Sequence, residues 1–152
     1  MRSSRLCSSS DVTRMYPHAA ASGSSSRMRR SASITHAESW CDGYPSVCPS
    51  ASCRTPLDVS KAETFAVLDD VLGDAAKLFP DAFVHLGGDE VDTSCWTKSS
   101  SIRRWLSQRN MTADDGYAYF AKRAADIAIS KGRRPVQWSE VYDHFKTELD
   151  KR

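Results

Sequence analysis

The chain has 152 residues, of which 40% are hydrophobic and 26% charged, and its formal net charge is +2. The composition is that of a globular protein, and no stretch approaches the roughly 20 apolar residues of a membrane-spanning helix. The nearly balanced charge argues against nucleic acid as a partner, because binding to phosphates relies on an excess of basic residues. The length suits one ordinary domain and falls short of the about 250 residues of a complete (β/α)₈ barrel.

The first 35 residues differ in composition from the rest. They hold eleven serines, six arginines and one acidic residue, Asp11, so their net charge of +5 leaves −3 for residues 36–152. An Arg- and Ser-rich, acid-poor start is typical of an organellar transit peptide, and it lacks the apolar run of a secretory signal peptide. We expect residues 1–35 to be a disordered or wrongly assigned N-terminus, with an organellar leader as the alternative.

Cysteine usage and one tripeptide indicate an oxidising compartment. Four cysteines fall within residues 36–152: Cys41, Cys48, Cys53 and Cys95. Their even number favours disulfides, with three pairings open, over a zinc site, whose ligand spacing they do not fit. Asn110 begins an Asn-Met-Thr tripeptide, the acceptor for N-glycosylation in the secretory pathway.

The first predicted elements follow a loop. Residues 37–59 contain several prolines and no apolar periodicity, which predicts the loop. Ser60 and Glu63 then have the spacing of a capping box, and apolar residues at steps of three and four predict a helix that Pro80 ends. Its apolar stripe consists of Phe65, Leu68, Leu72, Ala75 and Phe79. Residues 82–86 predict a short buried strand, which two glycines end.

A second round of helix and strand follows. A short helix is marked by Ile102, Trp105 and Leu106. Thr112 is placed to cap a longer helix that ends at Gly132. The stripe of this helix consists of Tyr117, Phe120, Ala124 and Ile127. Residues 134–138 predict another strand, and a last amphipathic segment carries Val141, Tyr142, Phe145 and Leu149. The order helix, strand, helix, strand, helix predicts an α/β fold with a parallel sheet.

The densest polar cluster lies at the C-terminal end of the first predicted strand, where α/β folds bind their ligands. It is the run HLGGDEVD at residues 85–92. The glycines allow close approach of a substrate, and Asp89 and Glu90 after them are placed to flank one pocket. Held close together, two carboxylates disfavour each other's ionisation, which suits one of them to act as a general acid. The alternatives are a solvated acidic turn, or a metal site formed by His85, Asp89, Glu90 and Asp92.

Several further motifs along residues 36–152 point to one family. The run at residues 85–91 is followed by Cys95-Trp96. Other segments read SWC at 39–41, GYP at 43–45, PLD at 56–58, LFPD at 78–81 and VQWSE at 136–140. Together they resemble glycoside hydrolase family 20, the β-N-acetylhexosaminidases, and in particular its plant-type members. The resemblance extends from about His36 to the C-terminus.

The resemblance implies a fold and a mechanism. The fold would be a partial (β/α)₈ TIM barrel with about two of its eight strand–helix units. The reaction would be retaining, substrate-assisted hydrolysis of terminal non-reducing N-acetyl-D-hexosamine residues of glycans, without a cofactor or metal. Asp89 would orient the 2-acetamido group and Glu90 would act as general acid and base. Trp138 would form a wall of the acetamido pocket, and His36 would help to position the acid.

The resemblance also implies the disulfide Cys53–Cys95, which leaves Cys41–Cys48 as the second pair. The parent enzyme would lie in the secretory pathway, the vacuole or lysosome, or outside the cell, with a homodimer as a candidate assembly. Residues 32–36 read ASITH where the family has Asp-x-Pro-Gly-His, and the other barrel strands have no counterpart. We therefore expect a fragment with little or no turnover by itself; the alternative is a non-catalytic remnant that binds a partner.

Overall fold

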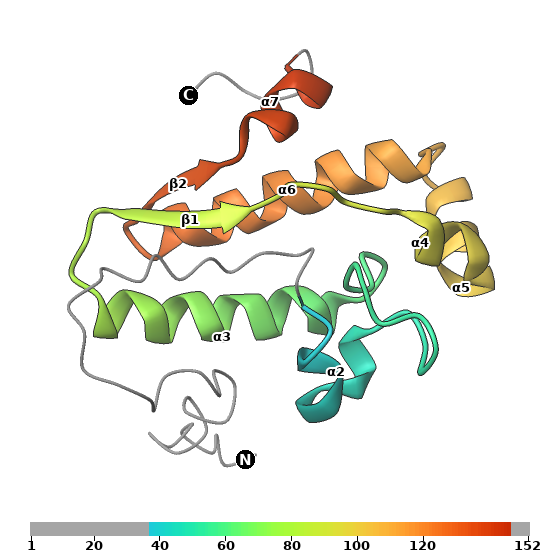
Figure 1. Ribbon diagram of the computed structural model, residues 1–152, viewed down its shortest axis with the longest axis horizontal. Coiled ribbons are helices and arrows are strands. Elements are labelled where there is room, and N and C mark those ends of the chain that lie inside the picture. Colours follow the sequence, from blue (N-terminus) through green and yellow to red (C-terminus); the bar gives the residue numbers. More distant parts are fainter. Residues whose placement is uncertain (1–36, 147–152) are drawn as a thin grey trace.

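Residues 37–146, the part of the chain that the computed structural model describes, alternate between helices and two short strands. The elements in Figure 1 are α2 (Trp40–Gly43), η2 (Pro45–Val47), α3 (Ala62–Leu78), β1 (Phe83–Gly87), α4 (Ser94–Lys98), α5 (Ser100–Ser107), α6 (Ala113–Ser130), β2 (Arg134–Gln137) and α7 (Ser139–Phe145). The predicted order of elements is confirmed, and the short helices α2, η2 and α4 are additional to it. Residues 1–35, His36 and Leu149 lie outside the described residues.

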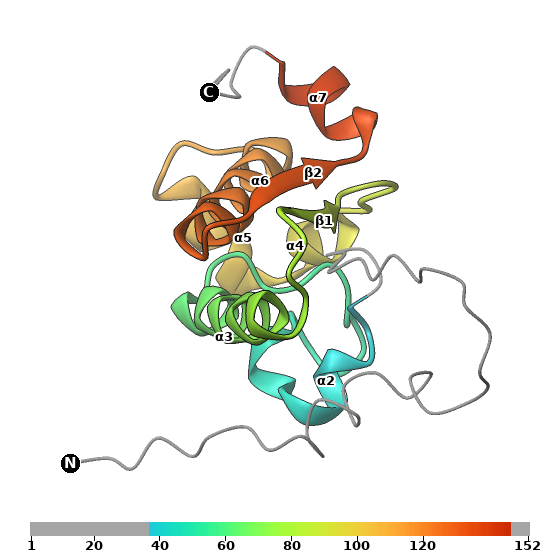
Figure 2. The same cartoon turned by 90° about the vertical axis from the view of Figure 1, so that its left-hand side faces the viewer.

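The two strands pair in parallel, as predicted, and form a two-stranded sheet. Phe83 is level with Arg134 and His85 with Val136, and the register shifts between His85 and Gly87. α6 lies along this sheet and α3 packs against α6 (Figure 1). The view in Figure 2 shows the same layers from one end, with α7 beyond the end of β2.

The two faces of the sheet have different surroundings. Leu86 is buried in the core, whereas Phe83 is 57% and Val136 39% exposed. Side chains alternate along a strand and level residues of parallel neighbours share a face, so Phe83, His85 and Val136 point away from the helices. On this open face the Arg134 guanidinium lies 5.0 Å from the centre of the Phe83 ring.

The start of α3 differs from the predicted capping box. Lys61 is the N-cap residue, and no side chain caps the helix. The hydroxyl and the backbone N–H of Ser60 both donate to the Asp58 carboxylate, at 2.5 and 2.9 Å. Glu63 accepts a hydrogen bond from the Ser46 hydroxyl at 2.7 Å. Because Asp58 binds Ser60 in a local turn, the helix begins one residue later than predicted.

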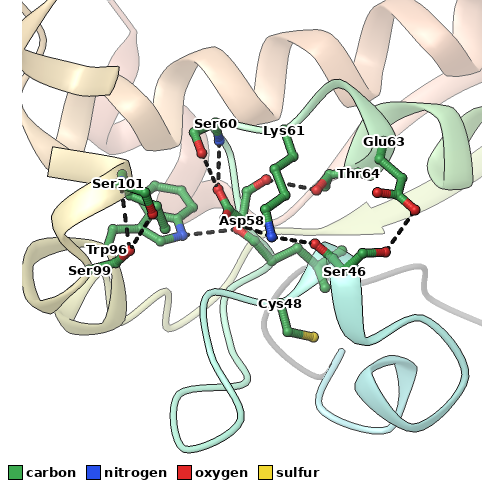
Figure 3. Close-up of polar contacts among 12 residues, drawn as sticks. Ser46, Cys48, Asp58, Ser60, Lys61, Glu63, Thr64, Trp96, Ser99 and Ser101 are labelled. Carbon is green, nitrogen blue, oxygen red and sulfur yellow. Dashed lines mark hydrogen bonds and ion pairs between the residues drawn. The ribbon is translucent and has the colours of Figure 1, made fainter. Parts of the chain in front are cut away.

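Asp58 is the centre of the polar contacts in Figure 3. Its side chain is 1% exposed and forms an ion pair with Lys61 at 3.4 Å. Its carbonyl oxygen accepts a hydrogen bond from the Thr64 hydroxyl at 2.7 Å, and the preceding carbonyl, that of Leu57, accepts one from the Trp96 indole at 2.9 Å. These contacts join the loop before α3 to the first turn of α3 and to α4.

The start of α6 confirms the predicted cap. The Thr112 hydroxyl accepts from the Asp115 backbone N–H at 3.1 Å, and the Asp115 carboxylate accepts from the Thr112 backbone N–H at 2.7 Å. The two residues thus form a reciprocal capping box. Gly132, with φ of 73°, follows the end of the helix as predicted.

The core lies between α3, α6 and the loop that precedes α3, and it includes most of the predicted stripe residues. Phe79 and Tyr142 are exceptions, because they are 47% and 53% exposed. Phe79 follows the last residue of α3 in an extended conformation, which the next residue, Pro80, favours. Val141 and Phe145 are four residues apart and lie on the buried face of α7. Tyr142, the residue after Val141, lies off this face. Among the described helices, none is long and apolar enough to cross a membrane.

Candidate active site

The predicted polar cluster follows β1, where the backbone takes unusual conformations. Gly87 and Gly88 have φ of 77° and 93°, and Glu90 has φ of 51°. Glycine adopts such left-handed conformations freely, whereas a residue with a Cβ does so at a cost in free energy. Such costs persist only where the surrounding structure holds the residue in place, and they cluster at functional sites.

Glu90 faces a hollow of about 400 Å³. The other lining residues include Asp92, Ser94, Cys95 and residues 52–56. Asp89 is not among the residues that line this hollow. Asp89 is half-buried whereas Glu90 is exposed, so the two neighbouring side chains have different surroundings.

Asp89 is half-buried and lies near a tyrosine that the sequence assigned only to the core. The buried Tyr117 hydroxyl donates a hydrogen bond to the Gly88 carbonyl, 29 residues earlier in the chain. Burial raises the pKa of Tyr117 to about 12, and the nearby carboxylates of Glu140 and Asp89 contribute to this rise. No motif signals Tyr117, whereas Glu140 belongs to the VQWSE run.

Trp138 lies beside the cluster because the two strands end side by side. Its backbone N–H donates to the Gly87 carbonyl at 3.1 Å, which extends the strand pairing by one bond. Its indole lies against the His85 imidazole, with ring centroids 4.7 Å apart, and is 51% exposed. His85 Nδ1 in turn accepts from the Gly87 backbone N–H at 3.0 Å. The structure thus brings Asp89, Trp138 and His85 to one end of the sheet.

Asp92, one residue of the metal alternative, has its hydrogen-bond partner within the same turn. Asp92 accepts from the backbone N–H and the hydroxyl of Ser94, at 2.8 and 3.0 Å. These bonds lower the pKa of Asp92 below 3.8. Within residues 37–146 no three side chains of His, Cys, Asp or Glu lie close enough together to hold a metal ion. Asp92 thus lies just before α4, with its carboxylate bound to Ser94.

Both expected disulfides are present, Cys41–Cys48 and Cys53–Cys95. The zinc alternative for these four cysteines is therefore wrong. Cys53–Cys95 joins residues 42 positions apart and ties the loop before α3 to α4, beside the hollow that Glu90 faces. His36, the remaining predicted site residue, lies outside the described residues.

The chain is similar in sequence to known proteins of one family. The sequence model described as "Glycosyl hydrolase family 20, catalytic domain" matches residues 17–152. Beta-hexosaminidase 1 of Arabidopsis thaliana is 51% identical over 117 residues, which are 77% of this chain and 22% of the relative. Beta-hexosaminidase 3 of the same plant is 44% identical over 117 residues, with the same coverage of 77% and 22%. The chain thus spans about a fifth of the length of the curated relatives that it matches.

Solved structures share the fold. A β-N-acetylhexosaminidase from Bacteroides fragilis superposes with a TM-score of 0.63 at 27% identity, covering 72% of this chain and 23% of that one. An exo-β-N-acetylglucosaminidase from Vibrio harveyi superposes with a TM-score of 0.63 at 24% identity. The match covers 70% of this chain and 19% of that one. The predicted fold class, a partial (β/α)₈ TIM barrel, is confirmed. On the family match and the identity to the plant relatives, the chain belongs to glycoside hydrolase family 20.

Proposed function

We propose that this chain carries the catalytic pair of an enzyme that hydrolyses terminal non-reducing N-acetyl-D-hexosamine residues from N-acetyl-β-hexosaminides. One observation supports the proposal above the others. Asp89 and Glu90 follow directly from a parallel strand, where α/β barrels hold their catalytic groups, yet they lie in different surroundings. Two neighbouring carboxylates with separate environments suit a reaction that needs two separate roles.

In the proposed mechanism the substrate supplies its own nucleophile. The oxygen of the 2-acetamido group attacks the anomeric carbon while the bond to the leaving oxygen breaks, which gives an oxazolinium ion. Half-buried Asp89 accepts a hydrogen bond from the acetamido N–H and balances the positive charge of this ion. The exposed indole of Trp138 forms one wall of the acetamido pocket. Water then attacks the anomeric carbon from the face that the leaving group occupied and breaks its bond to the acetamido oxygen. This step restores the acetamido group and the original anomeric configuration.

Glu90 is the proposed general acid and base. It protonates the leaving oxygen in the first step and removes a proton from the attacking water in the second. Its exposed position on the hollow supports this role, because the leaving group and the water must both pass through solvent-open space. His36 remains a proposed positioning residue for this acid, and no cofactor enters the scheme.

A chimera tests the assignment. Residues 37–146 replace the matching segment of Arabidopsis beta-hexosaminidase 1, and release of 4-nitrophenol from its N-acetyl-β-glucosaminide is measured. We expect Glu90→Gln to lower turnover about 10²–10⁴-fold, with a smaller loss on a dinitrophenyl glycoside, whose leaving group departs without protonation. Asp89→Asn should lower turnover on both substrates alike. Asp92→Asn is the matched control, since Asp92 binds Ser94.

Equal losses of Glu90→Gln on the two substrates would contradict the acid role. The 152-residue chain by itself is expected to show little or no turnover in the same assay, which is why the chimera carries the test. We include residues 36–152 in the proposed catalytic unit and leave residues 1–35 outside it.

Partner binding by a non-catalytic remnant is a second candidate function. The open face of the sheet supports it, because Phe83 and Val136 are exposed there and the outer edges of the described sheet are unpaired. Sedimentation of the chain over a range of concentrations tests for self-association, including the homodimer proposed for the whole enzyme. Association that persists in Glu90→Gln and disappears in Val136→Lys would favour this second function.

We also propose a location in the secretory pathway, the vacuole or lysosome, or outside the cell. The two disulfides support it, since such bonds persist in oxidising compartments. Asn110 is the proposed glycan acceptor, and it is exposed in the turn after α5. After expression through a eukaryotic secretory pathway, glycosidase treatment should increase the mobility of the wild type and leave Asn110→Gln unchanged. A wild type that carries no sugar would contradict the Asn110 assignment.

A further inference from the structure

The turn that carries Asp89 begins with two residues whose own conformation is weakly determined. Gly87 and Gly88 lack side chains and occupy the left-handed region, which leaves the chain many alternatives at this point. A carboxylate that must meet one N–H group of a substrate needs a fixed direction, and a misplacement of about 1 Å can cost 10²-fold in rate. A contact from outside the turn must therefore fix the direction of the Asp89 side chain.

Tyr117 provides such a contact. Its side chain is 7% exposed, and its hydroxyl donates to the Gly88 carbonyl. That carbonyl and the N–H of Asp89 belong to one planar peptide group, so a hydrogen bond to the oxygen also fixes the plane from which Asp89 extends. Val141 also approaches Gly88, so closely that a Cβ on Gly88 would lie 2.5 Å from its Cγ2.

The tyrosine itself is held firmly. Its ring packs edge-to-face on Phe145 of α7, with centroids 4.8 Å apart. Because the pKa of Tyr117 is raised to about 12, the hydroxyl keeps its proton, and with it the capacity to donate, throughout the physiological range. Asp89 and Glu140 contribute to this rise, so the carboxylates of the site favour the protonated form that holds the turn.

We propose that Tyr117 is a positioning residue for Asp89, acting through the Gly88 carbonyl. The inference rests on the proposed function, in which Asp89 binds the acetamido N–H of the substrate. Tyr117 does not touch the reacting atoms. It sets the direction of the Gly88–Asp89 peptide and thereby makes the site selective for a sugar that carries a 2-acetamido group.

The test compares Tyr117→Phe with Tyr119→Phe in the isotopically labelled 152-residue chain. Each variant loses one hydroxyl from α6 and keeps its ring, so the packing on Phe145 or Phe65 is retained. The Tyr119 hydroxyl accepts from Arg123 at 3.0 Å and makes a matched control. The first measurement, NMR of the backbone, follows the Gly88 carbonyl resonance and the fast motion of the Asp89 and Glu90 amides.

The second measurement is the ratio of the affinities for N-acetylglucosamine and glucose. It is obtained by calorimetric titration of the chimera carrying the same variants, because the 152-residue chain spans about a fifth of the length of its relatives. In Tyr117→Phe we expect a moved Gly88 carbonyl resonance, increased motion of Asp89, and an affinity ratio lowered roughly fivefold, the factor that one buried hydrogen bond contributes. Asp89→Asn should lower the ratio at least as far. Tyr119→Phe should change none of these quantities.

Each outcome has a separate meaning. If Tyr117→Phe leaves the Gly88 resonance and the motion of Asp89 as they are in Tyr119→Phe, the positioning role is wrong. An altered backbone with an unchanged affinity ratio also overturns it, since Tyr117 would then be merely structural. If the wild type does not distinguish the two sugars, the proposed function fails, while the backbone measurement still decides whether Tyr117 holds Asp89.

Discussion

The imidazole of His85 and the indole of Trp138 lie with their ring centroids 4.7 Å apart, across the ends of two parallel strands. The contact covers one side of an indole that is otherwise half-exposed. It also keeps the ring at the end of the sheet where Asp89 follows β1. The pairing of His85 with Val136 and the bond from the Trp138 N–H to Gly87 bring the two rings together.

Removing the imidazole should expose the indole. We expect His85→Ala to move the emission of Trp138 to longer wavelengths, because more of the ring then contacts water. Subtracting the spectrum of a Trp138→Phe variant isolates this emission from that of the other tryptophans. His144→Ala is the control, since His144 contacts Phe145 on α7. An unmoved emission in His85→Ala would show that the imidazole does not shield the indole.

The two disulfides should stabilise the chain unequally. Cys53–Cys95 closes a separation of 42 residues and Cys41–Cys48 one of 7. Loop-closure entropy then predicts losses in the free energy of unfolding of about 4 kcal/mol for a Cys53→Ser, Cys95→Ser double variant and about 2.5 kcal/mol for the other pair. Urea unfolding under oxidising conditions measures both. A larger loss for the shorter loop would contradict the entropic account.

Alanine at Gly88 should be costly for two separate reasons. Its φ of 93° disfavours any side chain, and the new Cβ would meet Val141 at 2.5 Å. We expect a loss of about 3 kcal/mol in the free energy of unfolding. Adding Val141→Ala should relieve the clash but leave the conformational part. Gly43→Ala, with no atom within 4 Å of its Cβ, is the control and should change stability by less than about 0.5 kcal/mol.

The buried carboxylate of Asp58 should matter more than an exposed one. Asp58→Ala removes the partner of Ser60 and Lys61 and should cost about 3 kcal/mol in the free energy of unfolding, measured in urea. Asp42→Ala removes an ion pair with Arg54 in which the aspartate is 75% exposed, so its cost should stay below about 1 kcal/mol. Similar costs for the two variants would show that the Asp58 contacts add little.

Acid should weaken the start of α6 in a defined range. Hydrogen bonds from the Thr112 backbone N–H and hydroxyl hold the pKa of Asp115 below 3.8. The folded chain therefore binds this proton less tightly than the unfolded chain does. The Asp115 carboxylate therefore stabilises the folded chain at pH values above its pKa in the unfolded chain. This stabilisation is lost as the pH falls through its pKa in the folded chain. Asp115→Asn should thus lose less stability than the wild type as the pH falls below about 4, with Asp126→Asn as the control.

Local information was sufficient where the interacting residues are close in sequence. Thr112 and Asp115 are three residues apart on one helical turn, so their capping box could be predicted from spacing. Ser60 and Glu63 have the same spacing, but Asp58 and Ser46 bind them instead. Ser46 lies in η2, which residue spacing did not predict, so the competing contacts could not be predicted either.

In the candidate site, too, the local features could be predicted from the sequence and the contacts between distant residues could not. An apolar run followed by two glycines correctly predicted that Asp89 and Glu90 follow the end of a strand, although only the C-terminal half of that strand is buried. The left-handed backbone at Glu90 follows from packing and not from the order of the residues. The contact of Tyr117 with Gly88 spans 29 residues and joins a helix to a turn. It could be identified only from the structure, which places α6 beside β1.

The capping box of α6 has a consequence for the timing of modification. The Thr112 hydroxyl completes the acceptor tripeptide that begins at Asn110. Once the helix has formed, this hydroxyl donates to the Asp115 carboxylate and accepts from the Asp115 backbone N–H. An oligosaccharyltransferase needs that hydroxyl free. We therefore expect any sugar on Asn110 to be attached before α6 folds, and a refolded chain offered to the same transferase to remain unmodified.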